Sequence, residues 1–553
     1  MYQALFRNRL IREYGIIVGT AFVLFIPFSG KPLHIDSPVT VYVAKQFIRN
    51  PLNPPLGHFG RLLSVWNATG LPTTSVFHAT PHPPLVSWYA AGIIHLFGDS
   101  ERVVNWSFFP FFAGTLLFFY ALSKLMGIRR RLSGTLLFAV SPALLINAQN
   151  VMYDVPLTLF CIGGFFWMFR NRGISDSLFA GLFAGCACLI KFTGGTLLIA
   201  GALYYLLMKQ WRHLLVFLLV AGALNTLWVV HNLLLFDAWQ LTKNGHAHFL
   251  AGDIRYRYER MVSYLGAGVL FPLFPLYLWW QSKKFRKTGI CIGLATLAWS
   301  SLLFAVLHYS FPSALFFWCC SFAGSTLVAW FFGTFFSCRR PAQPGANDTN
   351  RWNRCTRAAP LALHTALQII GGGFLTLYAV RYTLPFVFIL FLFMLVMMES
   401  VFSPRKQRVF SSIAGAISLL LSLALSFGDF QIVNAERRIA EDCRTRYPAT
   451  PIFYHGRLGY LYYMDKIGAH SISDTLQQPS PGAIAVENCF YSDDQKFIDR
   501  FRSRLTLIDS ACYPLPPFRT IGGRAGFYGN DRLPYSIDCS GSPRVFRMYK
   551  FTK

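Results

Sequence analysis

The chain has 553 residues, of which 54% are hydrophobic and 14% charged, and its mean hydropathy is +0.40. This composition excludes an ordinary soluble globular protein and indicates a membrane protein. The formal net charge of +27 would suit a nucleic-acid-binding protein. Many of the cations lie in short loops between apolar runs, however, where they set membrane topology and meet anionic lipid. We therefore predict contact with the lipid bilayer and none with nucleic acid.

Apolar runs near the length of about 20 residues that crosses a bilayer follow one another along most of the chain. The first has a basic front like that of a signal peptide, but no small-residue cleavage site follows it, so we predict an uncleaved first helix. The runs predict an α-helical polytopic membrane protein with about 13 transmembrane helices. They cover residues 13–29, 103–125, 132–149, 155–170, 176–192, 194–209, 214–235, 266–282, 288–308, 314–337, 360–380, 385–402 and 409–427.

Lysine and arginine gather at the N-terminus and in alternate loops between these runs. Because basic loops stay in the cytoplasm, this pattern predicts a cytoplasmic N-terminus. An odd number of spans then places the C-terminus on the other side, together with the acids and histidines that could carry chemistry. The basic clusters lie within residues 129–131, 170–172, 209–212, 283–287, 339–357 and 405–408.

The apolar run Leu85 to Phe97 has only 13 residues, which is typical of a segment that lies on the membrane. A crossing at this point would also place every later basic cluster outside the cell. We therefore predict one extracytoplasmic loop over residues 30–102, with a second surface helix over Val39 to Ile48. The whole transmembrane domain is expected over residues 1–427.

Residues 428–553 are charged and rich in proline and glycine, and they contain no further span. Short apolar segments predict a small α/β domain on the extracytoplasmic side. Four cysteines occur in it, and an even set in an oxidising compartment predicts two disulfides, with three connectivities open. They are Cys443, Cys489, Cys512 and Cys539.

Two aspartates are candidate catalytic residues. Asp36 follows the first span in HIDSPVTV, and Asp154 precedes an apolar run in MYDVPL. A carboxylate at a membrane surface loses solvent, so its basicity rises toward that of a general base. Both aspartates also suit a helix N-cap near a proline, and the sequence leaves both roles open. As catalytic groups, one would deprotonate an acceptor while the other would orient it or hold a metal ion.

Four other residues suit a phosphate group at the same face. His82 begins HPPL, Lys191 ends a span in LIKFTG, and Arg381 and Tyr382 lie in RYTLP. Arginine binds phosphate through two hydrogen bonds, whereas lysine supplies a point charge. Helix capping by His82 and snorkelling of Lys191 to the bilayer surface are the structural alternatives.

A polar loop over residues 236–265 contains His246 and His248, whose spacing fits a metal pair or two phosphate ligands. Arg255, Arg257 and Arg260 follow, and we expect them to form a solvated or lipid-facing surface. The chain has no glycine-rich phosphate loop, GxSxG motif or zinc signature, so a nucleotide enzyme is not predicted. A lipid-linked donor would supply an activated sugar at this face without a nucleotide.

These motifs together resemble the integral-membrane glycosyltransferases of the GT-C class. The resemblance is strongest to family 39, which includes protein O-mannosyltransferases and lipid A aminoarabinose transferases, and it covers roughly residues 10–430. It rests on Asp36, His82 to Leu85, Met152 to Leu157, Leu189 to Gly194 and Arg381 to Pro385.

The resemblance implies a GT-C fold, a polyprenyl-phosphate sugar donor, inversion at the sugar carbon, and Asp36 as the base. Many relatives have two adjacent acids in the first loop, whereas here Ser37 follows Asp36. No cofactor is therefore predicted, and a divalent cation stays open. The implied roles are catalysis by Asp36 and Asp154, binding of the donor phosphate by His82, Lys191, Arg381 and Tyr382, and substrate binding by His246 and His248.

We therefore predict a glycosyltransferase that moves a hexosyl or pentosyl group to an unknown lipid, glycan or protein acceptor on the extracytoplasmic face. A transporter or flippase of lipid-linked sugars is the alternative. Such a protein should carry ionisable residues within its spans, whereas here the charges gather at the span ends. The chain shows neither an ER retrieval signal nor a large sugar-binding domain, which favours a bacterial inner membrane with the C-terminal domain in the periplasm.

Overall fold

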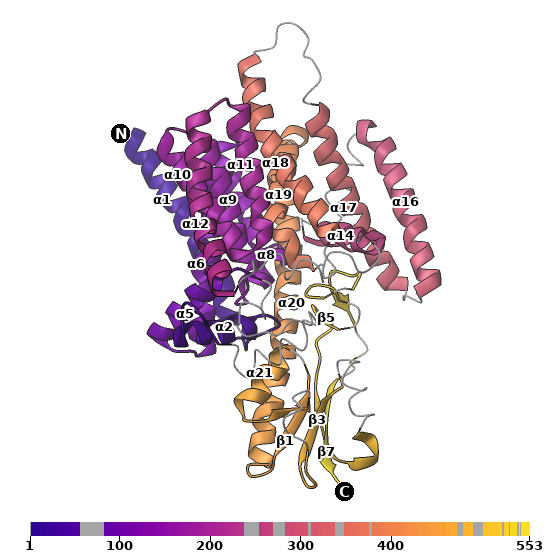
Figure 1. The fold of residues 1–553 in the computed structure, drawn as a ribbon. Coiled ribbons are helices and arrows are strands. Elements are labelled where there is room, and N and C mark those ends of the chain that lie inside the picture. Colours follow the sequence, from indigo (N-terminus) through magenta and orange to yellow (C-terminus); the bar gives the residue numbers. More distant parts are fainter. Residues whose placement is uncertain are drawn as a thin grey trace.

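A tall helical bundle is joined end to end with a smaller mixed sheet (Figure 1). The N-terminus lies at the end of the bundle far from the sheet, and the C-terminus lies in the sheet domain. The computed structural model describes residues 2–55, 82–236, 254–268, 283–307, 311–337, 348–374, 379–456, 458–472, 479–489, 501–522, 525–529, 531–538, 541 and 543–552.

Six helices in these ranges are long and apolar enough to cross a membrane, and a seventh span is added if one bent helix pair counts as a crossing. The sequence predicted about thirteen. The six are α1 (Tyr2–Phe25) with η1 (Ile26–Phe28), α6 (Glu101–Leu125), α12 (Trp211–Phe236), α17 (Phe311–Ser337), η3 (Val380–Thr383) with α19 (Leu384–Val401), and α20 (Pro404–Arg446).

The bent pair occupies the predicted span 132–149. It consists of α7 (Arg131–Ala139) and α8 (Pro142–Ala148), which meet at 61°. Pro142 has no backbone N–H and biases the residue before it away from the helical conformation. Ser141 is accordingly extended, at φ −66° and ψ 136°. The chain therefore turns at this point, and α8 is directed toward the polar residues described below.

Further helices, three of them short, complete the bundle. The predicted spans 155–170, 176–192 and 194–209 are helical but have at most 17 residues each, and 266–282 lies mostly outside the described residues. The short elements are α9 (Asp154–Arg170), α10 (Ile174–Ile190), η2 (Phe192–Gly194) and α11 (Gly195–Leu207). The longer helices are α16 (Lys283–Leu307) and α18 (Asp348–Phe374).

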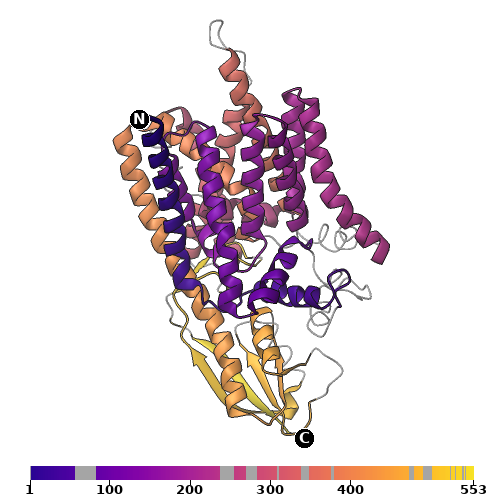
Figure 2. The same ribbon diagram turned by 90° about the vertical axis from the view of Figure 1, so that its left-hand side faces the viewer.

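The first loop contains the two predicted surface helices. They are α2 (Ser37–Arg49) and α5 (Leu85–Phe97), and α5 has the predicted 13 residues. Both lie across the end of the bundle that faces the sheet domain, rather than parallel to the long helices (Figures 1 and 2). A segment of 13 residues is too short to cross the hydrocarbon layer, so these helices fit a position at its surface.

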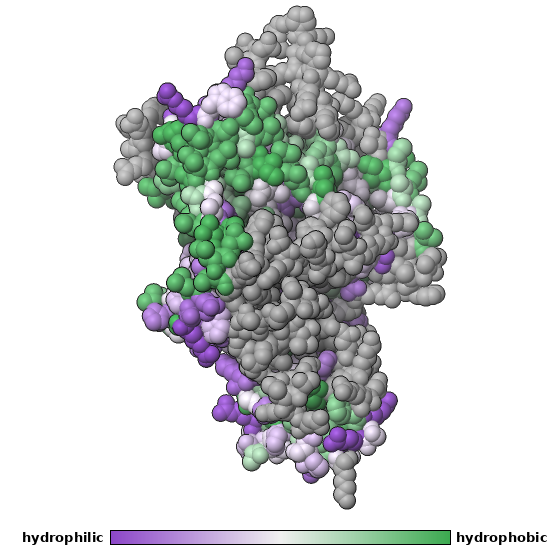
Figure 3. Space-filling view, in the orientation of Figure 1, coloured by the Kyte–Doolittle hydropathy of each residue, from purple (hydrophilic) through white to green (hydrophobic). Residues whose placement is uncertain are grey.

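The basic loops meet at the opposite end of the bundle. Arg357, near the start of α18, donates to the carbonyl oxygens of Leu125 at 3.0 Å and Phe169 at 3.3 Å, which belong to the last turns of α6 and α9. The backbone N–H of Arg130 donates to the Glu399 carboxylate at 2.9 Å. Figure 3 shows hydrophobic residues gathered on the helical part and hydrophilic ones above and below them. This distribution is that of a protein spanning a membrane more than once.

The helix α14 (Ile254–Gly268) packs against α17. Its residues Arg257 and Arg260 are buried, so the predicted solvated or lipid-facing surface is wrong for these two. The Arg260 guanidinium lies 4.3 Å from the centre of the Tyr256 ring, and Arg532 from the sheet domain lies 4.2 Å from the same ring. Contacts with aromatic rings and with the C-terminal chain thus replace exposure to solvent.

The C-terminal part is a mixed sheet against which helices pack, as the predicted α/β domain requires. Its strand order is β2-β1-β3-β7-β4, with β1 parallel to β2 and β3, and β7 antiparallel to β3 and β4. The elements are β1 (Ile452–His455), α21 (Leu458–Lys466), β2 (His470–Ser471), β3 (Ile484–Asn488), η4 (Arg502–Arg504), β4 (Leu505–Tyr513), β5 (Phe518–Arg519), β6 (Ser536–Ile537) and β7 (Arg544–Phe551).

A single helix joins the bundle to this sheet. The predicted domain boundary at residues 427 and 428 lies inside α20, which continues unbroken to Arg446. The last turns of α20 pack on the sheet, where Arg544 pairs with Glu436 at 2.7 Å and both side chains are buried. The two parts are therefore joined by a continuous helix rather than a flexible linker.

The prediction of two disulfides is wrong. Cys443 and Cys512 are free thiols, and Cys539 lies outside the described residues, so four paired cysteines are excluded. Cys443 is fully buried in the hydrophobic contact between α20 and the sheet, whereas Cys512 is exposed on the edge strand β4. An even count of cysteines indicates disulfides only when their positions bring the thiols together.

Candidate functional site

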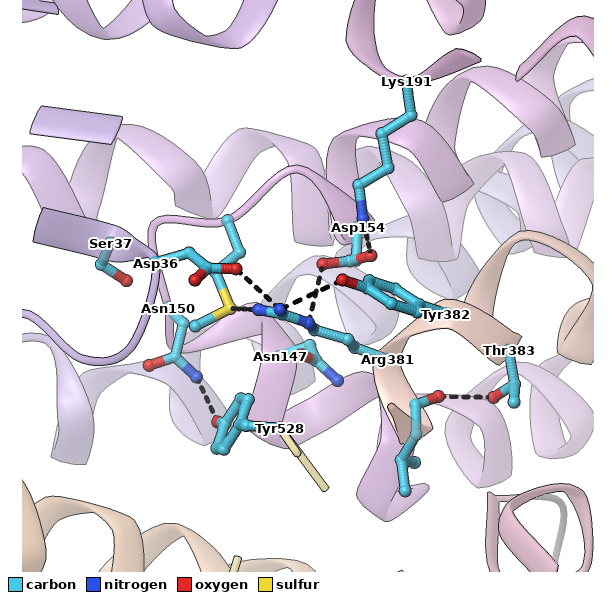
Figure 4. Close-up of polar contacts among 12 residues, drawn as sticks. Asp36, Ser37, Asn147, Asn150, Asp154, Lys191, Arg381, Tyr382, Thr383 and Tyr528 are labelled. Atoms are coloured by element: carbon cyan, nitrogen blue, oxygen red, sulfur yellow. Dashed lines mark hydrogen bonds and ion pairs between the residues drawn. The ribbon is translucent and has the colours of Figure 1, made fainter. Parts of the chain in front are cut away.

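Arg381 lies at the centre of a group of charged residues at the end of the bundle near the sheet domain (Figure 4). It belongs to the short 3-10 turn η3, which precedes the buried helix α19 and its Pro385. Its side chain is 3% exposed. Burial of a guanidinium requires nearby anions or hydrogen-bond acceptors, and Arg381 meets two carboxylates.

The first carboxylate is that of Asp36, immediately before α2. Its Oδ2 lies 2.7 Å from Nη2 of Arg381. Asp36 occupies the N-cap position, but its side chain makes no capping hydrogen bond. The carboxylate therefore serves the ion pair rather than the helix cap that the sequence left open. It is 29% exposed, so one side of it still meets solvent.

The second carboxylate is that of Asp154, in the first turn of α9, where the helix dipole favours an anion. Its Oδ1 accepts a hydrogen bond from Nζ of Lys191 at 2.5 Å, and its Oδ2 lies 3.9 Å from Nε of Arg381. Asp154 is 2% and Lys191 8% exposed. Lys191 is therefore a buried ion-pair partner, and the alternative of a lysine snorkelling to the bilayer surface is wrong.

Tyr382 contacts both cations. Its ring centre lies 4.4 Å from Nζ of Lys191, a cation–π distance. Its hydroxyl oxygen accepts from Nη2 of Arg381 at 3.4 Å. Asp36, Arg381, Asp154 and Lys191 thus form a row of alternating charges with Tyr382 beside it, and in that row Asp36 is the most exposed.

His82 lies beside this row, with its ring centre 4.5 Å from that of Tyr153. Burial, together with the charges of Lys191 and Arg381, holds the pKa of His82 well below its usual range. The imidazole is therefore neutral near pH 7. A neutral ring still donates one hydrogen bond, so binding of the donor phosphate by His82 stays a prediction.

No metal centre is found in the described part of the chain, where no three His, Cys, Asp or Glu residues are grouped to hold an ion. The two aspartates of the site already pair with Arg381 and Lys191. A divalent cation between them would face two positive side chains, so this set of residues does not fit one. His246 and His248 lie outside the described residues.

A second polar cluster, which the sequence did not predict, lies next to the site. Asp429 of α20 is fully buried and accepts hydrogen bonds from Lys31 at 2.6 Å, from Tyr528 at 2.7 Å and from Thr520. His34 lies 3.1 Å from the same carboxylate. Asn150 completes it by accepting from Lys31 and donating to Tyr528, both at 2.8 Å. These six residues are called the anchoring network.

A sequence signal for this network did exist. Asp429 is an acid near the end of the last apolar run, in SLALSFGDFQIV, and Lys31 and His34 precede the candidate base in SGKPLHIDSP. Asp429 and Lys31 are 398 residues apart. Nothing in either local sequence indicates its partner.

Residues 81–236 match the family of dolichyl-phosphate-mannose-protein mannosyltransferases. The matched stretch contains His82, Asp154 and Lys191 of the site. The resemblance to the family-39 enzymes is thereby confirmed for this stretch of the chain.

Two solved structures are similar over most of the chain. ArnT from Cupriavidus metallidurans bound to undecaprenyl phosphate is 13% identical with a TM-score of 0.41, over 89% of this chain and 95% of that one. The Archaeoglobus fulgidus oligosaccharyltransferase tethered with an acceptor peptide is 12% identical with a TM-score of 0.47, over 90% of this chain and 69% of that one. No curated protein matches the sequence.

Proposed function

We propose that this protein transfers a sugar from a polyprenyl-phosphate donor to an acceptor at the extracytoplasmic membrane face, with inversion at the sugar carbon. The observation that carries the proposal is the row of charges formed by Asp36, Arg381, Asp154 and Lys191, in which Asp36 is the most exposed. The family match of residues 81–236, which include Asp154 and Lys191, supports the same reaction class.

Asp36 acts as the general base. Its carboxylate is 29% exposed, against 2% for Asp154, so an acceptor hydroxyl can reach it. The acceptor oxygen forms a bond to the anomeric carbon, its proton passes to Asp36, and the bond from that carbon to the phosphate oxygen breaks. A single displacement of this kind inverts the configuration, and proton transfer to a positioned base contributes about 10²–10⁴-fold to the rate.

Arg381 and Lys191 stabilise the departing phosphate. The donor is a phosphodiester with one negative charge, and the departing polyprenyl phosphate gains a second. Cations held in a buried site are most effective where charge grows in the transition state. Asp154 contacts both cations, at 2.5 Å and 3.9 Å, and therefore positions them. Tyr382 packs beside Lys191 and limits where its ammonium can move.

The membrane orientation belongs to the same proposal. The N-terminus is cytoplasmic, residues 1–427 form the transmembrane domain, and residues 428–553 lie in the periplasm of a bacterium. The contacts of Arg130 and Arg357 support this arrangement, because they gather the basic loops at the end of the bundle far from the site. A phosphatase reporter fused after Lys553 should be active, and one fused within residues 338–358 should be inactive. The reverse pattern would place the site in the cytoplasm.

The reaction itself is tested by transfer with purified protein in nanodiscs, supplied with polyprenyl-phosphate sugars labelled in the sugar. Mass spectrometry of surface glycans from cells with and without the gene identifies the product. We expect one glycan to lose a single sugar in the deletion strain and to regain it with the wild-type gene but not with Asp36→Asn. Unchanged glycans, together with movement of labelled lipid across the bilayer, would favour the transporter instead.

A further inference from the structure

The segment that leads to the candidate base is held by residues from the C-terminal third of the chain. Asp429 pairs with Lys31 at 2.6 Å and with His34 at 3.1 Å. The hydroxyl of Tyr463 accepts a hydrogen bond from the backbone N–H of Leu33 at 2.7 Å. Three of the four residues from Lys31 to His34 are therefore fixed by α20 or by the sheet domain, immediately before Asp36.

The backbone between these contacts and Asp36 is strained. Ile35 has φ +47°, in the left-handed region that a β-branched side chain rarely adopts. Such a conformation persists only where the surrounding structure enforces it, and it is found at functional sites more often than elsewhere. Here the contacts of Lys31, Leu33 and His34 lie on one side of Ile35, and the ion pair of Asp36 with Arg381 lies on the other.

Tyr528 links the same network to Arg381. Its hydroxyl donates to Asp429 at 2.7 Å and accepts from Asn150 at 2.8 Å. Its ring lies edge-on to His34, with the ring centres 5.0 Å apart, and 5.9 Å from the guanidinium carbon of Arg381. Burial raises the pKa of the Tyr528 phenol well above its usual range, so the hydroxyl stays protonated and donates. Figure 4 shows Tyr528 below Asn150 and on the same side of the site as Asp36.

We propose that the anchoring network makes the C-terminal part of the chain a component of the catalytic unit, with Tyr528 as a positioning residue. Tyr528 acts through Asp429 and His34 to hold the strained turn that directs Asp36 at Arg381. Its ring also supports Arg381. The catalytic half of this inference rests on the proposed function, whereas the structural half, a held turn before Asp36, does not.

Tyr528→Phe is the decisive variant, because it removes the hydroxyl and keeps the ring beside His34 and Arg381. Asp429→Asn is less suitable, since it leaves the buried ammonium of Lys31 without its carboxylate and endangers folding. Tyr460→Phe is the matched control. Tyr460 is a buried tyrosine in the core of the sheet domain, and its hydroxyl donates to the carbonyl oxygen of Val486 at 3.3 Å.

Two measurements on the full-length protein in nanodiscs separate the halves of the proposal. Hydrogen exchange of a peptide covering residues 30–40 needs no substrate. We expect faster exchange in Tyr528→Phe, on the order of fivefold to tenfold as for a lost hydrogen bond, and no change in Tyr460→Phe. In transfer assays, kcat of Tyr528→Phe should fall on the order of 10- to 100-fold, the scale of a misplacement of about 1 Å. Its donor KM should stay within about threefold.

A double variant shows whether Tyr528 acts through the base. If it does, Tyr528→Phe added to Asp36→Asn should lower the residual turnover no further. Unchanged exchange over residues 30–40 would overturn the structural half. Normal turnover in Tyr528→Phe, or additive losses in the double variant, would overturn the catalytic half. A wild-type protein that transfers no sugar would defeat the proposed function, and the exchange measurement would still decide whether the turn is held.

Discussion

Replacing Asp36 with asparagine separates catalysis from folding more cleanly than any other change in the site. Asparagine keeps the shape of the side chain and one oxygen that can accept from Arg381. The carboxylate makes no helix-capping hydrogen bond, so no cap is lost. The change removes the charge-assisted part of one hydrogen bond, the 2.7 Å contact with Arg381. This costs about 1–2 kcal/mol of stability.

The effect on the reaction should be larger. Loss of a general base lowers the rate by about 10²–10⁴-fold, which corresponds to about 2.7–5.4 kcal/mol of activation free energy. Binding of the donor should become tighter, because Arg381 loses a competing negative charge and becomes more available to a phosphate. We therefore expect the variant to fold, to bind polyprenyl phosphate at least as tightly as the wild type, and to transfer almost no sugar.

The assay compares thermal unfolding, polyprenyl phosphate binding and single-turnover transfer in the purified proteins. Asp99→Asn is the matched control, since Asp99 is an exposed carboxylate of the same first loop, paired with Lys45, and lies outside the site. Near-normal transfer by Asp36→Asn would refute the assignment and make Asp154 the leading candidate base. Loss of donor binding together with transfer would show that Asp36 organises the site rather than removing a proton.

Other changes probe the buried side of the site and the thiols. Asp154→Asn leaves Lys191 buried without its 2.5 Å partner and should cost about 3–5 kcal/mol of stability. Adding Lys191→Met should recover most of the lost Tm but not donor binding. Because the pKa of His82 is lowered, unfolded chains bind a proton below about pH 6.5 that native chains do not. Stability should therefore fall as the pH drops from 7.5 to 5.5, and His82→Asn should reduce that fall in Tm. Cys512 should react at once with a maleimide in native protein and Cys443 only after unfolding, as peptide mass spectrometry can verify.

Local sequence predicted the helices of the first loop and the residues that meet at the site. The short run Leu85 to Phe97 became α5 with the predicted bounds, because the length of an apolar segment decides whether it can cross a bilayer. Asp36, Asp154, Lys191 and Arg381 come together because each lies at a helix end on the same side of the bundle. The alternation of basic loops predicts from sequence alone on which side of the membrane each helix end lies.

What the sequence did not predict depends on distant pairing or on proline. The sequence predicts one span across the break between α7 and α8 at Pro142, because both halves are apolar and hydropathy does not detect a bend of 61°. The pair Lys31 and Asp429 depends on two segments 398 residues apart. Nothing in a single sequence relates these two segments, although an isolated acid at the end of an apolar run indicates a partner elsewhere in the chain.

The continuity of α20 fixes the position of the sheet domain relative to the bundle. Its 43 residues extend about 65 Å at 1.5 Å per residue, whereas the hydrocarbon layer is about 30 Å thick. Roughly half of the helix therefore extends beyond the hydrocarbon layer. Where β5 contacts this part of α20, a Cβ on Gly428 would lie only 2.1 Å from the carbonyl oxygen of Phe518. The two backbones are therefore in direct contact. The sheet is therefore held at a fixed distance from the bundle by one continuous helix.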